Sequence, residues 1–406
     1  MLFARLLARF IRFGRLTVVD ADGRRHEFGG PPIEGIPCVT IRLHDRRLHS
    51  RLAFHPSLSV GEAYMDGTLT IEEGGLQAFL DLCAENLLRA GNISALTLAE
   101  RGARLFRRLQ QYNPAKRAKS NAAHHYDLSS ELYSLFLDAD RQYSCAYFDG
   151  PDMSLDAAQA AKKRHIAAKL LLRPGQKLLD IGSGWGGLGL SLARQADVEV
   201  TGITLSEEQL TVARRRADEA QLAHKVRFEL RDYRHQTGSF DRIVSVGMFE
   251  HVGVNHYLAF FRKWRDLLRE DGVGLLHSIG RSDGPGSTNP WVRKYIFPGG
   301  YCPALSEALA AVEKAGLLVT DIEVLRLHYA DTLRDWARRF QANRDKVATL
   351  YDERFCRMWE FYLAGSEAAF RHQGMMVFQM QLARRQDAVP LTRDYIADWE
   401  RTHALA

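Results

Sequence analysis

The segment Lys177–Leu188, with the sequence KLLDIGSGWGGL, constrains the fold of this chain more than any other. Its first five residues have the apolar character of a short buried strand, and four glycines follow within the next six positions. Glycines let the backbone turn tightly and approach a ligand, and the N-terminus of a following helix adds positive potential. Asp180, near the end of the strand, can accept hydrogen bonds. The segment therefore predicts a site for a nucleotide-like cofactor.

Alternating strand and helix patterns surround this segment and follow it along the chain. Short apolar runs predict strands at Lys177–Ile181, Glu199–Thr204, Val226–Leu230, Arg242–Val246 and Gly272–Ser278. Amphipathic patterns predict helices between them at Trp185–Ala196, Glu207–Gln221 and Val254–Leu268. This order predicts an α/β fold, with a doubly wound, mostly parallel sheet covered by helices on both faces. Ligands of such sheets bind beyond the carboxyl ends of the strands, so we expect the site there.

The N-terminal part of the chain has a different pattern. Strands are predicted at Leu16–Asp20 and Cys38–Leu43, and helices at Leu58–Met65 and Leu76–Arg89. A chain of 406 residues is long enough for two domains, each with its own core. We therefore expect a smaller α+β domain over residues 1–115 and a catalytic domain over residues 116–406.

The net charge of +6 favours an anionic partner, and the positive charge is concentrated in two places. Residues 101–120 contain seven basic residues and no acidic one. The opening segment predicts an amphipathic helix with an arginine side (Arg5, Arg9, Arg12, Arg15) and an apolar side (Leu2, Phe3, Leu6, Leu7, Phe10, Ile11, Phe13). Such a helix suits an anionic lipid surface. The alternative is a helix packed on its own domain with its arginines in water.

Several classes of protein are disfavoured by what the chain lacks. Its five cysteines are scattered and form no CxxC pair, which argues against a disulfide framework or structural zinc site and fits a reducing cytoplasm. No apolar run approaches the ~20 residues that span a bilayer. The basic run at 101–120 has few aromatic residues and no recognition motif, which argues against nucleic-acid binding. Glu250-His251 resembles a metal pair, but no second set of ligands accompanies it, so we expect no metal site.

The glycine loop by itself fits two classes of cofactor. Gly182, Gly184 and Gly187 satisfy the GxGxxG spacing of dinucleotide sites, but those sites usually add an acidic residue at the end of the second strand. Here that strand ends in Thr204 and Leu205, which departs from the usual pattern of both dinucleotide and S-adenosylmethionine sites. The D-x-G-x-G pattern led by Asp180 favours S-adenosylmethionine, with Gln209 replacing the acid as ribose partner. The alternative role for Gln209 is structural, as the third residue of a helix capped by Ser206.

Separated segments elsewhere carry motifs that are more specific than the loop. They are HHYDLSSELYSLFLD (124–138), QYSCAYF (142–148), LDIGSGWGG (179–187), GITLSEEQ (202–209), SVGMFEHVG (245–253), LLHSIG (275–280), YIFPGGYCPAL (295–305) and LRLHYADTLRDW (325–336). Through this joint pattern the chain resembles the cyclopropane-fatty-acyl-phospholipid synthases, which are S-adenosylmethionine-dependent. The segment SVGEAYMDG (59–67) is similar to the N-terminal lipid-binding extension of full-length bacterial members.

This resemblance implies a reaction and the residues that perform it. A methylene group is added across a cis double bond in an acyl chain of a membrane phospholipid, through a carbocation that a bound bicarbonate ion deprotonates. The positions that match the family's bicarbonate site are Cys145, Glu250, His277, Ile279 and Tyr329. For the cofactor we expect contacts from Tyr143, Ser144, Asp180, Gly182, Gly184, Thr204, Leu205, Gln209, Asp232 and Tyr233. Ser183 and Tyr233 depart from the cysteine and tryptophan common at these positions, and both substitutions keep size and character.

The resemblance also implies where the enzyme works. We expect a cytoplasmic protein associated peripherally with anionic lipids at the inner face of the membrane, and the family resemblance suggests a homodimer. The nearest alternative activity is acyl C-methylation, which gives a methylene-branched or methyl-branched chain from the same carbocation. Small-molecule N-methyltransferases share the scaffold but do not need the N-terminal domain. A non-catalytic lipid-binding paralogue is the remaining alternative, and the joint presence of the site residues counts against it.

Overall fold

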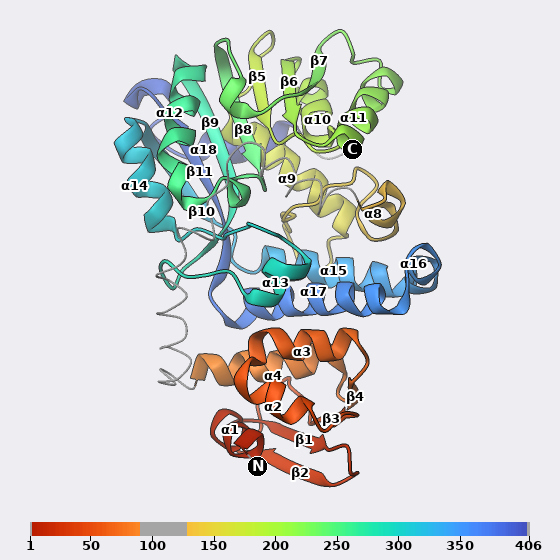
Figure 1. The fold of residues 1–406 in the computed structure, drawn as a ribbon. Helices are drawn as coiled ribbons and strands as arrows, with labels where there is room; N and C mark the ends of the chain where they lie inside the picture. The colour runs from red at the N-terminus through yellow and green to blue at the C-terminus, as the bar shows by residue number, and fades with distance from the viewer. Residues whose placement is uncertain (1, 90–127, 404–406) are drawn as a thin grey trace. The chain divides into compact units, whose positions relative to one another are not determined.

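The computed structural model describes residues 2–89 and 128–403, which form two compact units (Figure 1). One unit contains residues 2–89, 287–298 and 333–375, and the other contains residues 128–286, 299–332 and 376–403. The predicted domain boundary at 115/116, the basic run at 101–120 and the His124-His125 pair lie outside the described residues. The interleaving of the two units along the chain was not part of the sequence prediction.

The second unit is built on a seven-stranded sheet with the order β10-β11-β9-β8-β5-β6-β7. Its strands are β5 (Lys177–Ile181), β6 (Glu199–Thr204), β7 (Val226–Leu230), β8 (Phe240–Val246), β9 (Leu268–Arg281), β10 (Leu318–Val324) and β11 (Met375–Ala383). The pairs β5–β6, β6–β7, β5–β8 and β8–β9 are parallel, and β10–β11 is antiparallel. The predicted α/β class with a mostly parallel sheet is therefore confirmed. All five strands predicted in this region are present, and β9 is longer at both ends than predicted.

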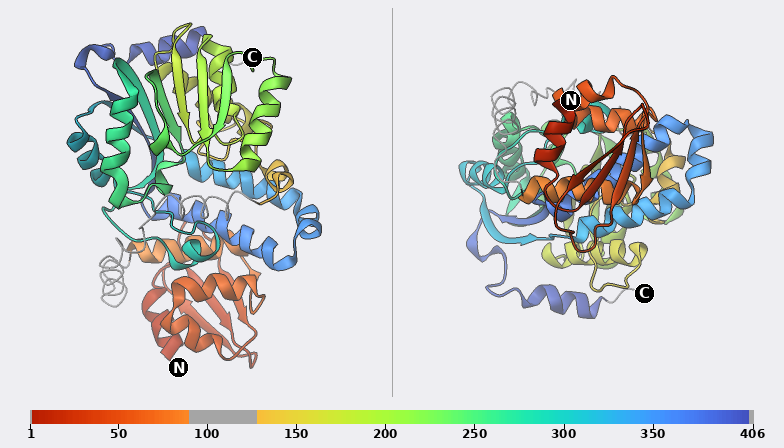
Figure 2. Two further views of the ribbon diagram at one scale, coloured as in Figure 1. Left: turned by 45° about the horizontal axis from the view of Figure 1, so that its top comes forward. Right: turned by 90° about the horizontal axis from the view of Figure 1, so that it is seen from below.

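Helices cover both faces of this sheet (Figure 2). The helices of this unit are α8 (Ser130–Phe136), α9 (Leu155–Lys169), α10 (Gly187–Ala196), α11 (Glu207–Glu219), α12 (Tyr257–Leu267), α14 (Leu305–Ala315) and α18 (Asp394–Thr402). One hydrophobic core joins α12 and α14 to the sheet, and a second joins α9, α10 and α11 to it. Because the neighbours of β5 are β6 on one side and β8 on the other, the strand order reverses at β5. A ligand crevice is expected at such a reversal.

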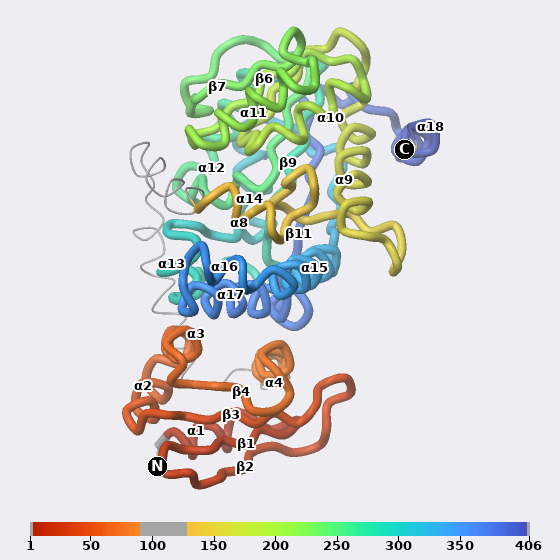
Figure 3. Tube along the Cα trace, turned by 90° about the vertical axis from the view of Figure 1, so that its right-hand side faces the viewer, coloured from red at the N-terminus to blue at the C-terminus, as the bar shows by residue number. Residues whose placement is uncertain are grey.

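The first unit contains a four-stranded sheet with the order β2-β1-β3-β4 (Figure 3). Its strands are β1 (Arg15–Val19), β2 (Arg25–Gly29), β3 (Val39–Leu43) and β4 (Leu69–Glu73). The N-terminal helices are α1 (Leu2–Phe10), α2 (Leu48–Phe54), α3 (Pro56–Met65) and α4 (Gly75–Arg89). The predicted strands and helices of this region are all present within one or two residues, and the helix predicted at Leu58–Met65 starts at Pro56.

Helices from the C-terminal half of the chain complete the first unit. They are α13 (Pro290–Tyr295), most of α15 (His328–Ala342), α16 (Arg344–Leu350) and α17 (Glu353–His372). The Tyr64 hydroxyl donates to Glu360 at 3.1 Å, and His372 lies 2.9 Å from Glu85. These bonds join α3 and α4 to α17 across more than 280 residues of sequence.

The opening helix is shorter than predicted. It ends at Phe10, and the chain turns at Gly14, where φ is +70° and a Cβ would lie 2.5 Å from Leu82. The prediction of Arg12 and Arg15 on the helix is therefore wrong, and Arg15 opens β1. Phe3, Leu7 and Phe10 of the apolar side pack against the core of the N-terminal sheet. This packing is the alternative named from the sequence, and it leaves Arg5 and Arg9 exposed. Among the described residues, no helix is both long enough and apolar enough to cross a membrane.

Candidate active site

The glycine loop forms a backbone cradle at the carboxyl end of β5. The N–H groups of Gly182 and Ser183 both donate to the Ile203 carbonyl, at 2.9 and 3.0 Å, which fastens the loop to β6. Gly184 has a φ of +54°, and a Cβ added there would meet no atom within 4 Å. Its backbone therefore borders open space, as a close approach to a ligand requires.

Two buried polar atoms beside the cradle have no hydrogen-bond partner among the described residues. They are Oδ2 of Asp180 and Oγ of Ser183. Burial raises the pKa of Asp180 to about 7. Because a buried polar group without a partner costs free energy, such atoms mark a place where a polar ligand completes the bonding. The cradle and these atoms fit the charged methionine end of S-adenosylmethionine.

Thr204 and Gln209 are hydrogen-bonded to each other at the end of β6. Thr204 Oγ1 donates to Gln209 Oε1 at 2.9 Å, and the Ser206 hydroxyl accepts from the Gln209 N–H at 3.2 Å. The helix-capping alternative is therefore present in the structure. The bond to Thr204 also fixes the orientation of the Gln209 amide, so its NH₂ group remains the end that can reach a ribose hydroxyl. Leu205 is half-buried beside them.

Asp232 and Tyr233 follow β7 and have local partners of their own. The Asp232 carboxylate accepts from the Arg234 N–H at 3.0 Å and from its guanidinium at 2.9 and 2.5 Å. Burial alone would raise the pKa of Asp232, but the hydrogen bonds and charge of Arg234 outweigh it and lower this pKa. The structure thus gives Asp232 a strong partner that the sequence did not anticipate. Tyr233 packs edge-on against Phe260 with ring centroids 5.1 Å apart.

A buried lysine holds the segment that contains Tyr143 and Ser144. Lys162 of α9 donates to Ser144 Oγ and to Gln142 Oε1, each at 2.8 Å. Burial lowers the pKa of Lys162 to about 8. Its positive charge acts on three other buried groups, Asp180, Cys145 and His277. The ammonium group of Lys162 therefore interacts electrostatically with buried residues that are far apart in the sequence.

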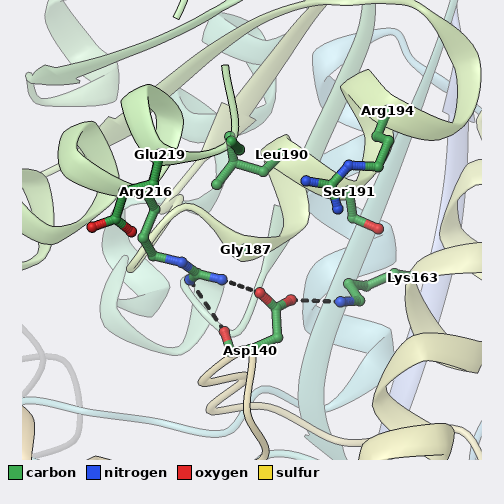
Figure 4. A pocket seen from close by; sticks show the side chains of 9 residues that line it. Asp140, Lys163, Gly187, Leu190, Ser191, Arg194, Arg216 and Glu219 are labelled. Carbon is green, nitrogen blue, oxygen red and sulfur yellow. Dashed lines mark hydrogen bonds and ion pairs between the residues drawn. The ribbon is translucent and has the colours of Figure 1, made fainter. Parts of the chain in front are cut away.

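The same segment is fastened to the glycine loop by Asp140 (Figure 4). The Asp140 carboxylate pairs with Lys163 at 2.5 Å and with Arg216. Arg216 also donates to the carbonyls of Trp185 at 3.0 Å and of Asp140 at 3.3 Å. A Cβ on Gly187 would lie 2.6 Å from Asp140 Oδ2. These groups line a surface pocket of about 310 Å³, and their mutual pairing makes it a structural support for the loop.

Cys145 is buried and is fastened to the first turn of α15. The Ala146 N–H donates to Thr332 Oγ1 at 3.0 Å, and the Phe148 N–H donates to His328 Nδ1 at 2.9 Å. Tyr329 lies between these two partners in the sequence and is itself buried. The structure therefore fixes the segment of Cys145 to the helical turn of Tyr329. Burial raises the pKa of Cys145 well above its usual value, so the thiol is not a thiolate nucleophile.

Glu250, His277 and Ile279 meet at the ends of β8 and β9. Glu250 lies on the short helix Phe249–His251, and its Oε1 accepts from the Ile279 N–H at 2.6 Å. Its Oε2 is buried and has no partner among the described residues, and burial raises the pKa of Glu250 to about 7. Burial, reinforced by the charge of Lys162, lowers the pKa of His277 well below its usual value. A neutral imidazole and a carboxyl with a free oxygen fit a small anion that carries a hydroxyl group.

Three aromatic residues of these motifs have structural contacts within the protein. Phe249 stacks on Tyr257 with ring centroids 4.3 Å apart and is fully buried in the core. The Tyr301 hydroxyl donates to Glu307 at 2.6 Å. Tyr147 is stacked between His165 and His328, with ring centroids at 4.3 and 4.9 Å. These contacts explain the residues structurally without a ligand.

Comparison with known proteins identifies the family. The family model described as mycolic acid cyclopropane synthetase matches residues 113–380. The chain belongs to this family. A probable fatty acid methyltransferase of Pseudomonas putida is 39% identical over 364 residues, which cover 86% of each chain. The cyclopropane-fatty-acyl-phospholipid synthase of Escherichia coli K12 is 38% identical over 361 residues, 87% of this chain and 90% of that one. This member of the cyclopropane synthetase family is thus an enzyme of the S-adenosylmethionine-dependent methyltransferase class.

Solved structures of the family agree with the fold. The cyclopropane synthase MmaA2 from Mycobacterium tuberculosis has a TM-score of 0.63 and 34% identity, and the match covers 67% of this chain and 99% of that one. Mycolic acid cyclopropane synthase CmaA1, complexed with SAH and CTAB, has a TM-score of 0.62 and 34% identity over the same shares. The catalytic unit of this cyclopropane synthetase family member therefore has the class I methyltransferase fold.

Three residues of the site were not predicted from the sequence: Lys162, Thr332 and Gln379. Lys162 had a readable signal, because polar residues recur on the buried face of α9 at positions 159, 162, 165 and 169. Gln379 interrupts the apolar run MMVFQMQL of β11, which also indicates a buried polar contact. Thr332 gave no such signal. The roles expected for the residues of the bicarbonate and cofactor sites stay predictions.

Proposed function

We propose that this enzyme converts cis double bonds in the acyl chains of membrane phospholipids into cyclopropane rings. S-Adenosylmethionine is the methyl donor, and a bound bicarbonate ion is the base that deprotonates the resulting carbocation. The observation that carries the proposal is Oε2 of Glu250, which is buried and without a partner among the described residues, while Oε1 accepts from the N–H of Ile279, two residues after the neutral His277 on β9. The family and the similarity to the Escherichia coli synthase support the substrate class.

The cofactor supplies a methyl group on a positively charged sulfur, and the residues of the chain orient it. Gly182 and Gly184 present their backbone to it, while Asp180 and Ser144 lie at its polar end. Lys162 keeps the Ser144 hydroxyl in place through the bond at 2.8 Å. An alkene is a weak nucleophile, so fixed alignment of the two reactants in a site that excludes water supplies much of the rate.

The proposed anion site consists of Glu250, His277, Tyr329 and Cys145, and Glu250 can bind the anion in either protonation state. When Glu250 is protonated, its Oε2–H donates to the anion while Oε1 keeps the Ile279 N–H. When Glu250 is ionised, Oε2 accepts from the hydroxyl of the bicarbonate. The His277 ring and the Tyr329 hydroxyl act as further donors, and the Cys145 thiol, which is not ionised, adds no negative charge. Bicarbonate supplies the base that the chain's own side chains do not.

A second activity is favoured by other relatives. The Pseudomonas putida relative is named a probable fatty acid methyltransferase, and the tuberculostearic acid methyltransferase UfaA1 of Mycobacterium tuberculosis is 34% identical over 94% of this chain. Loss of a different proton from the same carbocation gives a methylene-branched chain. Acyl C-methylation is therefore the alternative outcome of the same first step.

The enzyme reaches its substrate, we propose further, as a cytoplasmic protein bound peripherally to anionic lipids. The exposed arginines Arg5 and Arg9 of α1 supply positive charge on the N-terminal unit. Arginines attract an anionic leaflet while the apolar side of the helix stays packed on its own domain.

Product analysis tests the proposal directly. The purified protein is incubated with S-adenosylmethionine, bicarbonate and liposomes of cis-unsaturated phospholipid, and the released fatty acids are analysed by gas chromatography and mass spectrometry. A ring-containing product one CH₂ heavier, without a double bond, is the expected result. A branched product that retains a double bond would assign acyl C-methylation instead. No change in the acyl chains would overturn both.

A further inference from the structure

Gln379 contacts His277 from the neighbouring strand, deep in the sheet. It lies on β11, next to β9, and its side chain has no exposed surface. Its amide Nε2 is 3.2 Å from Nδ1 of His277. Its carbonyl Oε1 is buried and has no hydrogen-bond partner among residues 2–89 and 128–403.

The orientation of the Gln379 amide can be inferred by comparing which buried polar groups each of its two orientations leaves without a hydrogen-bond partner. With Nε2 toward the ring, one N–H is bonded, while the other N–H and the carbonyl oxygen have no partner among the described residues. The opposite orientation would bury both N–H groups in the place where the carbonyl now lacks a partner. Buried N–H groups without an acceptor are rarer in proteins than carbonyls with an unused lone pair. The amide therefore donates, and Nδ1 of His277 accepts.

A neutral histidine has one N–H, so this bond decides where the hydrogen sits. Burial and the nearby charges of Lys162 and Lys169 keep His277 neutral. If Nδ1 accepts a hydrogen bond, the hydrogen is on Nε2. We propose that Gln379 is a positioning residue that holds His277 as the Nε2–H tautomer, so that His277 presents a hydrogen-bond donor to the anion. The donor role rests on the proposed function, whereas the tautomer does not.

The tautomer matters because donors are scarce around the anion. The Ile279 N–H is already bonded to Glu250 Oε1. An ionised Glu250 offers only lone pairs, and a His277 with its hydrogen on Nδ1 would add another lone pair. The Tyr329 hydroxyl would then be the remaining side-chain donor of the proposed site, and the negative charge would face lone pairs of both Glu250 and His277 and bind weakly. The Nε2–H tautomer replaces that repulsion with an attractive hydrogen bond.

The test uses the full chain with ¹⁵N-labelled histidine, free of cofactor, lipid and bicarbonate. The ring nitrogens of His277 are assigned by comparison with His277→Gln, and their chemical shifts distinguish the two tautomers. We expect Nε2–H in the wild type. In Gln379→Glu, measured at a pH where the new carboxyl group is ionised, the carboxylate can only accept, so we expect the hydrogen on Nδ1 or on both nitrogens. A wild-type His277 protonated on Nδ1, or an unchanged Nε2–H in Gln379→Glu, would overturn the assignment.

A matched control comes from the same strand. Gln381 is also buried, but its Nε2 donates to the Lys169 carbonyl at 2.6 Å and to the Tyr395 hydroxyl at 2.9 Å. Gln381→Glu introduces the same change two residues away, and we expect His277 to remain Nε2–H. If both variants alter His277 alike, the specific role of Gln379 is wrong. Gln379→Met serves where the glutamate variant does not fold, and there we expect a mixture of tautomers.

Steady-state kinetics test the donor role of His277 separately from the assignment of its tautomer. We expect Gln379→Glu to raise the KM for bicarbonate about tenfold or more, as loss of a hydrogen bond to a charged group does, with the KM for S-adenosylmethionine little changed. An unchanged KM for bicarbonate would refute the donor role. Turnover of the wild type that does not depend on bicarbonate would instead contradict the proposed function and leave the tautomer assignment standing.

Discussion

Glu250 is a buried carboxyl group without a cation beside it, and its donors are the Ile279 N–H, its own backbone N–H and the Ser278 hydroxyl. Its pKa of about 7 in the folded protein lies above the ordinary value of 4.5. The folded state therefore favours the protonated form, whereas the unfolded chain ionises freely. The resulting loss of stability is absent below pH 4.5, grows as the pH rises to about 7, and is constant above that.

Replacement of this carboxyl should therefore stabilise the protein. Glu250→Gln keeps an acceptor for the Ile279 N–H and cannot ionise. We expect it to raise the free energy of unfolding by about 3 kcal/mol at pH 8 and by about 1 kcal/mol at pH 5. Denaturant unfolding at the two pH values measures the difference, and Glu313→Gln on the exposed side of α14 is the control. A variant less stable than the wild type at pH 8 would mean that the carboxylate has a partner.

The same residue and Cys145 should separate turnover from cofactor binding. Glu250→Gln and Cys145→Ser alter the proposed anion site but leave the glycine loop intact. We expect turnover to fall by about 100-fold or more, with the Kd of S-adenosylmethionine changed little. Single-turnover assays and calorimetry give the two quantities. Equal losses of turnover and of S-adenosylmethionine affinity would refute the view that Glu250 and Cys145 act only at the anion site.

At the scale of elements, Gly184 in the loop after β5 and Gly187 at the start of α10 have different reasons to be glycine. A Cβ on Gly184 would project into open space, whereas a Cβ on Gly187 would collide with Asp140 and Gln142. Gly184→Ala should cost about 1 kcal/mol for the positive φ and weaken S-adenosylmethionine binding severalfold. Gly187→Ala should cost about 1–3 kcal/mol by overpacking. Thermal unfolding with and without S-adenosylmethionine distinguishes the two variants. Weaker cofactor binding in Gly187→Ala than in Gly184→Ala would contradict the role of Gly184 in the backbone cradle.

The first turn of α15 gives a further prediction at this scale. Thr332 accepts from the Ala146 N–H and donates to the His328 carbonyl at 2.7 Å. Thr332→Val keeps the shape but leaves the Ala146 N–H without an acceptor, which costs about 1–3 kcal/mol. We expect turnover to fall because the segment of Cys145 loosens, and Thr332→Ser to restore it. Equal activity of the valine and serine variants would exclude the hydroxyl's role.

Helices and strands were predicted correctly where the local sequence pattern determines them. The predictions failed where contacts between distant residues determine the structure. Strands β5 to β8 are short apolar runs between turn signals, and their positions were predicted within two residues. The predicted opening helix was too long because its apolar pattern continues past Phe10, whereas the N–H groups of Arg12 and Phe13 donate to the distant Asn86 side chain instead of continuing the helix. Strand β11 was not predicted. Its contact with His277 joins residues 102 apart, and no local pattern reports such a contact.

The residues of the candidate site likewise fall into two groups, those that the local sequence pattern predicts and those that it does not. Gly184 and Asp180 could be placed from the loop alone, because strand, turn and helix follow one another in the chain. Cys145, Glu250 and Tyr329 were selected through the family resemblance, since spacing alone does not bring them together. Arg234 was not predicted as the partner of Asp232, although the two are only two residues apart, because hydrogen bonding depends on the turn that they form.

At the scale of the whole molecule, the N-terminal unit raises the question of how the enzyme meets a lipid surface. Its opening helix cannot insert its apolar side, because Phe3, Leu7 and Phe10 are packed in the core. Deleting the helix would remove core residues along with charge, so its effect would not isolate binding. Charge alone can be removed by Arg5→Gln with Arg9→Gln, since both side chains are exposed.

We expect this double variant to fold normally and to bind anionic liposomes less tightly. An arginine near an anionic leaflet contributes about 1 kcal/mol, so two contribute about 2 kcal/mol, or roughly 30-fold in affinity. Co-sedimentation at low and high salt measures the effect, which salt should diminish because it screens exposed charges. The control pairs Arg227→Gln with Arg401→Gln, whose exposed side chains lie on the other unit. If the control loses as much affinity as the variant, binding depends on net charge rather than on α1. If neither loses affinity, the lipid contact lies elsewhere.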